Sequence, residues 1–572
     1  MKSGINFQHK GLKGAVNGFL ARRVEKILSI PGQKLYKKFV KATLNTKVSQ
    51  QAVLAEILNY AKDTVIGNEH GFGSIESYDD YHTQVPVRDY EDHRPYVDRH
   101  TRGEENVLFP GKPLMYNRSS GTTMLPKLIP VTPYSFQRTI KDRGKLWLYG
   151  LSRDFPGVYK GQSFSVVSPS DEGHTEDGTP FGSVSGVMRR NIPEFMKLTH
   201  SPPYCTTLIE NYDSKVYTMI RFSLACDVSV MFTGNPATVL NFALKTDEWK
   251  EDLIRDIHDG TLKADLELSS EIRNEVESYL QPAPERANEL NRIASSNDRF
   301  RPAEYWPNLK LIHTWKNGNT RLVIPKLGPW FRKDTPILDF GYIASEIMAT
   351  DLIEPETDGS ILQVQNGFYE FTRYEDEYKP GREFLMAHQL EVGQRYYIYV
   401  TTFSGLYRYD MNDVIEVVGY FNSAPILRFL FKGKGITNMQ GEKLSEEQFI
   451  EAVAQAAKNT GISHDFFIGY PDTDISGYKL NIEFLEDYSD ERIAGFREAV
   501  DKALCRVNVE YEAKLSSQRL KPIEIVKLGK NSFSRYRALR LEEGAHEGQI
   551  KWLHLSGTKA TKERIRKLLI EE

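Results

Sequence analysis

The chain has 572 residues, and its 74 Lys and Arg nearly balance its 77 Asp and Glu, which leaves a formal net charge of −3. This balance argues against a nucleic-acid-binding protein, because such proteins usually carry a basic excess. Forty per cent of the residues are hydrophobic, which is enough for packed cores and excludes wholesale disorder. Length alone predicts about three or four domains, or fewer if they are large α/β domains.

The cysteines and the hydropathy pattern predict a cytoplasmic protein. Cys205, Cys226 and Cys505 are too few and too far apart for a disulfide framework or a zinc site. No run of about 18 apolar residues is present, so we expect no membrane span. Arg and Glu residues interrupt the apolar residues of segment 14–30, which favours an amphipathic helix packed on the first domain. Attachment of this segment to a membrane surface is the alternative.

Helical and strand patterns alternate along the first 300 residues, which predicts an α/β fold. Apolar residues at helical spacing predict a helix over 53–61, with Ser49 as its N-cap. Strands are expected at 164–167, 228–232 and 309–314, and helices at 239–257 and within 265–300.

The pattern changes twice in the second half of the chain. Segments 368–371, 396–402 and 414–420 are rich in aromatic and β-branched residues and predict an antiparallel, barrel-like sheet. After residue 431 a compact α+β unit is expected. Its predicted elements are a helix over 445–461 opened by a capping box, a strand at 480–484, a helix over 489–504 and a strand at 522–528. The domain boundary is therefore placed between 1–430 and 431–572.

A run of small and hydroxylated residues at 119–123 is the most informative motif. It comprises Ser119, Ser120, Gly121, Thr122 and Thr123, and Lys127 follows. Small residues let backbone N–H groups approach a polyphosphate, and a lysine adds a mobile positive charge. The GxxxxGK[ST] spacing of a Walker A loop is absent. From these residues alone, a Ser/Thr-rich turn with an incidental lysine is an equal alternative.

This segment, Ser-Ser-Gly-Thr-Thr-x-x-Pro-Lys, resembles the phosphate-binding signature of the adenylate-forming (ANL) superfamily, with Met124 where most members have glycine. Four further segments follow in the superfamily's order, at 177–186, 306–318, 341–346 and 404–419. Their combination is similar to the GH3 family, whose plant members join acyl acids such as auxin or jasmonate to amino acids. The resemblance extends from about residue 30 to residue 555.

The resemblance implies a large composite N-terminal domain, with α/β layers and a barrel-like subdomain, and a small mobile C-terminal lid. It implies that ATP is bound by the phosphate loop and by residues of the later motifs. Tyr342 would stack on adenine, Glu346 would hold Mg²⁺, and Asp413 would bind the ribose hydroxyls. The remaining nucleotide-site candidates are Gly318, Ser345 and, near the inter-domain hinge, Lys434. For each of these residues a purely structural role is the alternative.

The catalytic lysine implied by the resemblance is Lys551, in a Gly-Gln-Ile-Lys segment like the family's GQxK element. The family's following Pro-Arg is replaced here by Trp552 and Leu553. Lys443 and Lys530 are lesser candidates for this role.

The implied function is an ATP-dependent ligase that adenylates a carboxylic acid and transfers the acyl group to an amine, for which an amino acid is the expected acceptor. An acyl-CoA ligase and a catalytically weak nucleotide-binding homologue are the alternatives. The expected partners are therefore small acids and amines, with no nucleic acid, and a monomer is favoured.

Overall fold

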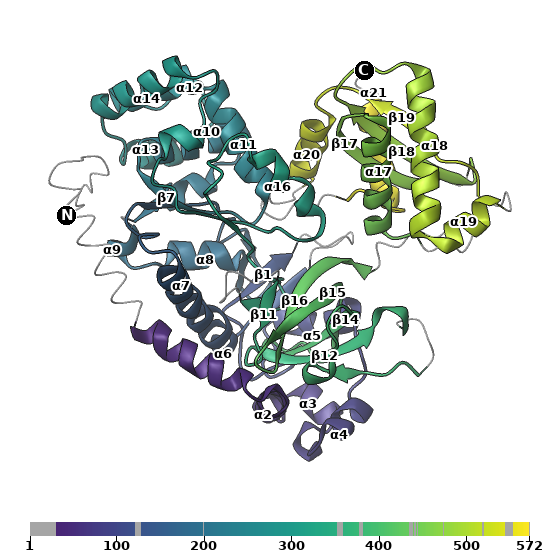
Figure 1. The fold of residues 1–572 in the computed structure, drawn as a ribbon. Helices are drawn as coiled ribbons and strands as arrows, with labels where there is room; N and C mark the ends of the chain where they lie inside the picture. Colours follow the sequence, from purple (N-terminus) through teal and green to yellow (C-terminus); the bar gives the residue numbers. More distant parts are fainter. Residues whose placement is uncertain are drawn as a thin grey trace. The chain divides into compact units, whose positions relative to one another are not determined.

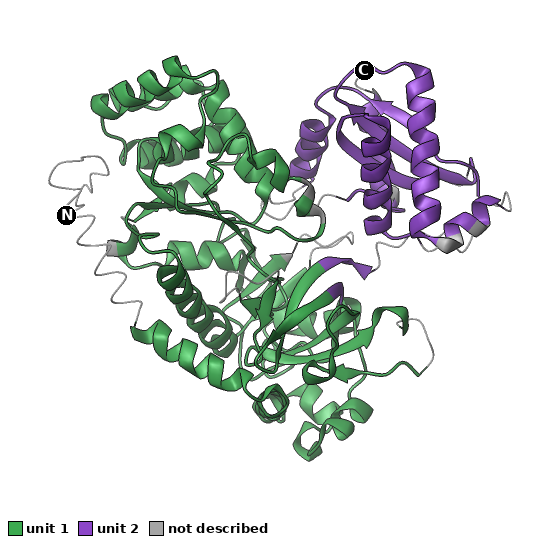
Figure 2. Cartoon of the chain, viewed as in Figure 1, with its two compact units in different colours: residues 1–411, 416–429 green, residues 412–415, 430–572 purple. Residues whose placement is uncertain are grey.

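A computed structural model describes most of the chain and divides it into two compact units (Figures 1 and 2). The described residues are 30–119, 127–197, 199–351, 359–376, 381–433, 437, 439, 442, 444–472, 474–516, 520–543 and 553–570. Unit 1 comprises residues 1–411 and 416–429. Unit 2 comprises 412–415 and 430–572.

A five-stranded parallel sheet forms the α/β layer of unit 1, in the order β6-β3-β7-β8-β9. Its two faces are buried by different helices, because successive side chains of a strand point to opposite faces. Met231 and Ile312 belong to a large core with helices α10 and α11, whereas Val230 and Leu311 pack with Leu151 of α7. The elements are β3 (Gln162–Ser165), β6 (His200–Ser201), β7 (Val228–Phe232), β8 (Leu311–His313), β9 (Ile337–Leu338), α7 (Arg143–Asp154), α10 (Tyr212–Leu224) and α11 (Pro236–Glu248).

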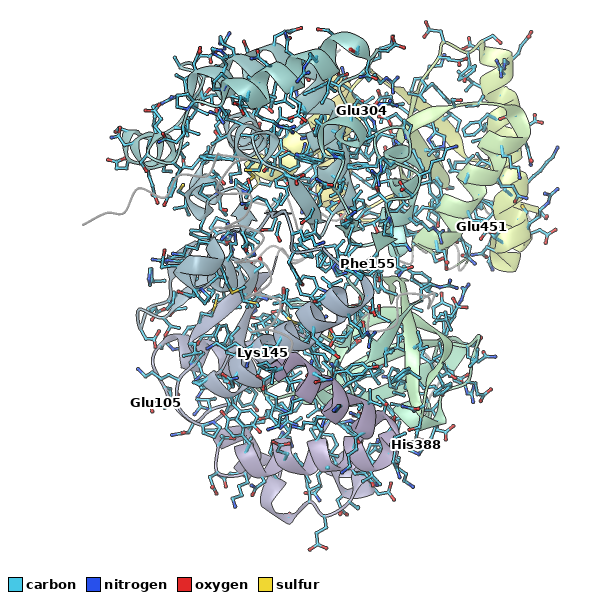
Figure 3. The ribbon with its side chains drawn as sticks, turned by 60° about the vertical axis from the view of Figure 1, so that its left-hand side comes forward. Glu105, Lys145, Phe155, Glu304, His388 and Glu451 are labelled. Carbon is cyan, nitrogen blue, oxygen red and sulfur yellow. The ribbon has the colours of Figure 1, made fainter. Side chains whose placement is uncertain are left out.

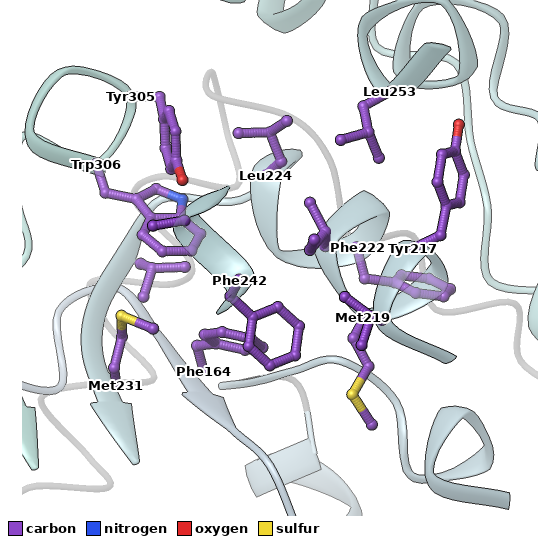
Figure 4. Close-up of a cluster of buried hydrophobic side chains, with 14 of the residues drawn as sticks. Phe164, Tyr217, Met219, Phe222, Leu224, Met231, Phe242, Leu253, Tyr305 and Trp306 are labelled. Carbon is purple, nitrogen blue, oxygen red and sulfur yellow. The ribbon is translucent and has the colours of Figure 1, made fainter. Parts of the chain in front are cut away.

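Aromatic rings fill the larger of these two cores (Figure 4). Phe164 of β3 meets Phe242 of α11 edge to face at 4.9 Å, and Trp306 lies 5.9 Å from Phe164. Edge-to-face packing adds to the gain from burying these large side chains. The outer helices α12 (Lys250–Asp259), α13 (Ser270–Glu277) and α14 (Pro284–Ser296) extend the same core.

Two further sheets complete unit 1. A four-stranded sheet has the order β2-β1-β5-β4, and a seven-stranded sheet has the order β10-β11-β16-β15-β14-β12-β13, with antiparallel pairing of β12 to both β13 and β14. The first contains β1 (Met115–Ser119), β2 (Lys127–Val131), β4 (Gly173–His174) and β5 (Pro180–Gly182). The second contains β10 (Thr350–Asp351), β11 (Ser360–Leu362), β12 (Gly367–Arg373), β13 (Leu385–Met386), β14 (Arg395–Thr402), β15 (Tyr409–Phe421) and β16 (Ala424–Lys432).

Short helices from the first hundred residues pack against these sheets through an aromatic core. This core joins Leu54 and Ile57 of α2 to Tyr116 of β1, Phe368 of β12 and Tyr407. A helix covers residues 30–43, and α2 (Thr46–Ala61), α3 (Val65–Glu69), α4 (Tyr78–Gln84) and α5 (Tyr90–Thr101) follow it.

Unit 2 is a three-stranded sheet, β17-β18-β19, with helices on both faces. On one face, Phe449 of α17 lies 6.4 Å from Phe467, and Phe496 of α18 lies 6.1 Å from Phe484. On the other face, Phe466 and its neighbours pack against α20 and α21. The elements are α17 (Glu446–Thr460), β17 (His464–Asp472), β18 (Gly477–Phe484), α18 (Asp490–Val507), α19 (Val509–Ser516), β19 (Glu524–Leu528), α20 (Ser532–Glu542) and α21 (Lys559–Ile570).

Three sequence predictions of helices need correction. The helix expected over 239–257 is two helices, because Trp249 leaves helical geometry at φ −102°, ψ 15°. The helical region 265–300 is divided between α13 and α14, and Pro284 begins the second. The N-cap of α2 is Asn45, whose side chain accepts from Val48 N, and not Ser49. The capping box at Ser445 and the left-handed Gly461 that ends α17 are confirmed.

No helix in the described part of the chain is both long and apolar enough to cross a membrane.

Two buried histidines make the stability of unit 1 sensitive to acid. Burial lowers the pKa of His93 and of His100 to about 4. In the folded state, the Nε2 atoms accept from Tyr407 N at 3.3 Å and from Leu108 N at 3.1 Å, and protonation would destroy these acceptors. Above pH 6.5 both rings are neutral in either state. Between about pH 6.5 and pH 4 only the unfolded chain takes up the protons, so stability falls as the pH falls.

We expect urea midpoints of the protein to decrease from pH 7.5 to pH 5, and His100→Gln to reduce this dependence. The loss is at most about 1.4 kcal/mol per pH unit for each histidine. His258→Gln is the control, because His258 is half exposed beside Asp259. An equal pH dependence in the His100 variant and the wild type would contradict this explanation.

Candidate active site

The predicted phosphate loop closes a β-hairpin of the four-stranded sheet. Ser119 is the last residue of β1 and pairs in antiparallel register with Lys127, the first residue of β2. Residues 120–126, which include the candidates Ser120, Gly121, Thr122 and Thr123 and also Met124, lie outside the described residues. Strand β5, from the predicted motif at 177–186, pairs in parallel with β1 and places Gly182 opposite Asn117.

Lys127 points its ammonium toward two groups from distant parts of the sequence. Its Nζ donates to Tyr409 Oη at 3.0 Å and lies 4.0 Å from Glu346 Oε1. The Tyr409 hydroxyl in turn donates to the same carboxylate oxygen at 3.3 Å. The ammonium also lies 5.4 Å from the centroid of the Tyr90 ring, within cation–π range. A positive charge, a phenol and a carboxylate therefore converge at the base of the hairpin.

Glu346 is presented by a tight turn whose backbone is fixed from both sides. Ala344 N donates to Ile347 O at 2.9 Å, and the Ser345 carbonyl accepts from Asn117 Nδ2 at 3.5 Å. The Glu346 side chain is 12% exposed. Ser345 thus contacts β1 through its carbonyl, and the partly solvated carboxylate of Glu346 lies beside Lys127.

The residues before this turn place Tyr342 against the seven-stranded sheet. Gly341 has φ +78°, and a Cβ there would lie 2.6 Å from Thr350 Oγ1, so only glycine fits without strain. Tyr342 N donates to the same Thr350 hydroxyl at 2.7 Å. The Tyr342 ring is buried and stacks on Phe429, with centroids 5.9 Å apart and planes 7° apart.

Asp339 connects the predicted motif at 306–318 to this segment. Its carboxylate accepts from Lys316 N at 2.7 Å, from Asn317 Nδ2 at 3.0 Å and from Gly341 N at 3.0 Å. Burial is the largest influence on the Asp339 carboxyl and raises its pKa, although these donors stabilise the charged form. Gly318 follows at the start of a 3-10 helix, η4 (Gly318–Leu322), with φ +61°.

Asp413 lies within strand β15, four residues after Tyr409, and pairs with a lysine. Lys432 Nζ, at the end of β16, lies 2.6 Å from Asp413 Oδ1, and the Asp413 side chain is buried. Lys434, the predicted hinge lysine, lies outside the described residues, as do Lys443 and Lys551.

A buried ion pair anchors the start of β15. Arg408 and Glu370 are 3% and 1% exposed, and Arg408 Nη2 lies 2.9 Å from Glu370 Oε1. The other end of the guanidinium donates to the carbonyls of His82 at 3.0 Å and Val85 at 2.9 Å. These contacts hold Arg408 at φ +45°, a conformation that is unfavourable for a residue with a side chain.

Aromatic side chains gather where strands β7 and β8 end. The His313 ring lies 4.2 Å from Phe340, 5.2 Å from Trp147 and 6.0 Å from Phe232, measured between centroids. Burial lowers the pKa of His313 to about 3, so the ring is neutral at physiological pH. In open α/β sheets, ligands bind at the carboxyl ends of the strands, where this cluster lies.

Among the described residues, no group of three or more His, Cys, Asp or Glu side chains could hold a metal ion by itself. Glu346 offers one partly exposed carboxylate, which fits Mg²⁺ bound mainly through water and substrate phosphates. Cys205 is buried, and burial raises its pKa to about 12, so its interpretation as a packing residue stands.

Three residues of this region were not among the predicted site residues. Tyr409 lies inside the motif segment 404–419, Lys432 lies two residues before Lys434, and Asp339 lies two residues before the motif at 341–346. Each makes its contact across strands or turns, and the sequence did not specify those partners.

Comparisons with known proteins agree with this architecture. The GH3 family N-terminal domain matches residues 35–337, the central domain 360–432 and the C-terminal domain 447–560. A probable indole-3-acetic acid-amido synthetase, GH3.11 of Oryza sativa subsp. japonica, is 25% identical over 551 residues, which cover 89% of this chain and 91% of the relative. A 4-substituted benzoates-glutamate ligase, GH3.12 of Arabidopsis thaliana, is 24% identical, with 89% and 92% covered.

Two solved structures share the fold. The GH3.15 acyl acid amido synthetase superimposes with a TM-score of 0.81 at 21% identity and covers 93% of this chain and 94% of its own. A 2-hydroxyisobutyryl-CoA ligase in its postadenylation state gives a TM-score of 0.51 at 12% identity, with 91% and 92% covered. The fold is thus that of the adenylate-forming enzymes. Within this class, the chain belongs to the GH3 family.

We expect Arg408→Met to destabilise the protein by about 3–5 kcal/mol, because it leaves the Glu370 carboxylate buried without its partner. Urea unfolding measures this loss. Arg408→Met combined with Glu370→Leu is expected to recover part of it, since no buried charge remains. The control is Arg332→Met, which removes an exposed pair with Asp334 and should cost at most about 1 kcal/mol. If the loss of stability in the double variant equals or exceeds the sum of the losses in the Arg408→Met and Glu370→Leu single variants, the pairing is contradicted.

Proposed function

We propose that this protein is an ATP-dependent acyl acid amido synthetase. It activates a carboxylic acid as an acyl-adenylate and joins the acyl group to the amine of an amino acid. The family assignment supports this class, since relatives that align along most of the chain are amido synthetases and an amino-acid ligase. The observation that carries the proposal is the approach of Lys127, at the base of the predicted phosphate loop, to within 4.0 Å of Glu346.

In the first half-reaction, a carboxylate oxygen of the acid attacks the α-phosphorus of ATP, and the bond from this phosphorus to pyrophosphate breaks. Lys127 and the backbone of residues 119–123 would bind the departing phosphates, because negative charge accumulates there in the transition state. Asp413, held by Lys432, would accept hydrogen bonds from the ribose hydroxyls. Tyr342 would provide the aromatic surface for adenine.

Mg²⁺, when bound, neutralises charge on the phosphates, and Glu346 is the residue that would hold it. Tyr409 is a positioning residue in this scheme. Its hydroxyl accepts from Lys127 and donates to Glu346, so it bridges the ammonium and the carboxylate, which lie 4.0 Å apart.

In the second half-reaction, the amine attacks the acyl carbon, loses a proton, and AMP leaves. The adenylate is a mixed anhydride, so no protein nucleophile is needed. We propose that residues 431–572 act as a mobile lid, with Gly433 and Gly435 in the hinge, and that Lys551 belongs to the first half-reaction only.

The aromatic cluster at the ends of β7 and β8 supports a proposal about the kind of acid that the protein accepts. Trp147, Phe232 and Phe340 are apolar, and the buried His313 is neutral. Contact with this cluster would favour an apolar or aromatic acid over an acid with a second carboxylate, because that carboxylate would be desolvated there without a partner.

Acid-dependent exchange of labelled pyrophosphate into ATP tests the first half-reaction. A panel of aromatic and aliphatic acids, followed by mass analysis of products formed with amino acids or with coenzyme A, tests the second. Amide products support the proposal, and thioester products would instead identify an acyl-CoA ligase. ATP binding without exchange for any acid would identify a catalytically weak nucleotide-binding homologue.

We expect Lys551→Ala to lower the exchange rate at least about 100-fold, because it removes a positive charge from the reacting phosphates. ATP binding, measured by calorimetry, should change much less. Lys530→Ala is the matched variant, since Lys530 is another lysine of the C-terminal unit. A loss of exchange in the Lys530 variant with normal exchange in the Lys551 variant would transfer the assignment.

We expect Tyr409→Phe to raise the KM for ATP and to lower kcat, roughly tenfold in kcat/KM, since it removes one charge-assisted hydrogen bond. Tyr90→Phe is the control, because the hydrogen bonds of the Tyr90 hydroxyl within the described residues are with the Leu128 backbone. Equal effects in the two variants would show that loss of any phenol, and not the link between Lys127 and Glu346, disturbs the site.

A further inference from the structure

Positive charge is concentrated at the start of this nearly neutral chain. Residues 1–55 contain eleven of the 74 Lys and Arg but only one of the 77 Asp and Glu. The net charge of −3 is therefore the sum of a strongly basic N-terminal segment and an acidic remainder of the chain. Such asymmetry is typical of proteins that bind an anionic surface.

The first described helix, residues 30–43, is fixed on unit 1 by its inner face. A Cβ at Gly32 would lie 2.4 Å from Tyr149 Cβ of α7, so the two helices are in close contact. Phe39 stacks on Phe421 of β15, with centroids 6.4 Å apart, and Thr43 Oγ1 accepts from Asn422 Nδ2 at 2.8 Å. Helix α7 can be located in Figure 3 by its labelled residue Lys145. These contacts with α7 and β15 set the orientation of the helix over 30–43.

The opposite face of this helix carries only positive charges. Lys34, Lys37, Lys38 and Lys41 follow one another at helical spacing, and Lys47 follows in α2; all five are exposed. Residues 30–48 contain no Asp or Glu. Within the described parts of the chain, none of these five lysines has an ion-pair partner. The four unpaired ammonium groups on this anchored helix face, with exposed Lys47 close behind in the sequence, create a local positive potential that no described acidic side chain neutralises by contact.

Large apolar side chains are exposed at both ends of this lysine face. Ile30 is 76% exposed, Leu44 64% and Val48 57%. Only six other large hydrophobic residues are similarly exposed among the described residues, and they are scattered from Leu114 to Leu485. Aliphatic groups flanked by lysines match the interface of a lipid bilayer, where the side chains enter the acyl region and the ammonium groups meet the headgroups.

We propose that residues 30–48 form a surface that binds anionic lipid membranes reversibly. The charge complementarity of five lysines with phosphate headgroups supplies the attraction, and Ile30, Leu44 and Val48 supply the insertion. A nucleic acid would match the lysines equally well but would gain nothing from exposed aliphatic side chains, so a membrane is the better fit. This surface lies outside the site described above, and its function is independent of the proposed activity.

Vesicle co-sedimentation of the full chain tests the proposal. We expect binding to vesicles of phosphatidylcholine mixed with phosphatidylglycerol and much weaker binding to pure phosphatidylcholine. Raising the salt from about 0.1 M to about 1 M shortens the Debye length from about 10 Å to about 3 Å and should release the protein. The variant Lys34→Glu/Lys37→Glu/Lys38→Glu/Lys41→Glu should lower the partition coefficient at least about tenfold.

A matched control separates this surface from net charge. The variant Lys310→Glu/Lys333→Glu/Lys502→Glu/Lys521→Glu changes the total charge equally at exposed lysines elsewhere and should bind like the wild type. Leu44→Ser/Val48→Ser should weaken vesicle binding while leaving its salt dependence unchanged. Thermal melting checks that each variant is folded.

Three results would overturn the proposal. The first is equal binding to neutral and anionic vesicles. The second is an equal loss in the two charge-reversal variants. The third is a protein that binds single-stranded RNA but not vesicles, and whose RNA binding is unchanged by Leu44→Ser/Val48→Ser. This result would assign the lysines to nucleic acid.

Discussion

The buried ion pair between Arg408 and Glu370 is the constraint on which the geometry of the candidate site depends. Two charges removed from water are stable only when every lone pair and proton finds a partner, and here the carbonyls of His82 and Val85 take the remaining guanidinium protons. These contacts connect strand β12 and the end of α4 to Arg408, the residue that precedes β15. Tyr409 and Asp413 follow on that strand, so their positions are inherited from a contact that touches no substrate.

Strand topology then brings together motifs that are distant in the sequence. The parallel pairing of β5 with β1 places the segment around Gly182 beside the hairpin of β1 and β2, and the turn at Ser345 is held by Asn117 of the same strand β1. Lys127 and Glu346 approach each other because strand β2 and the turn at Ser345 are both held by strand β1. The polar groups of the site are thus positioned by strand pairing and by side chains that bond to the main chain.

Charge is used in two different ways in this chain. At the candidate site, single positive groups are matched to single acids or phenols, as for Lys127 and Lys432, so the arrangement is specific and local. On the helix over 30–43, lysines accumulate without partners in the described structure, and the fixed inner face of the helix leaves them all pointing one way. The first arrangement suits a small, precisely oriented ligand, whereas the second suits an extended anionic surface.

Local patterns in the sequence predict the family and the layered α/β fold, and both predictions are confirmed. The small residues at 119–123, the capping box at Ser445 and the β-branched segments of β14 and β15 are all local signals. The end of α11 at Glu248 and the cap of α2 by Asn45 are local features for which the sequence offered competing signals, and the folded structure shows which of them is used. The contacts of Tyr409 with Lys127 and Glu346 join residues far apart in the chain, and no periodicity or spacing encodes which distant side chain will supply the partner.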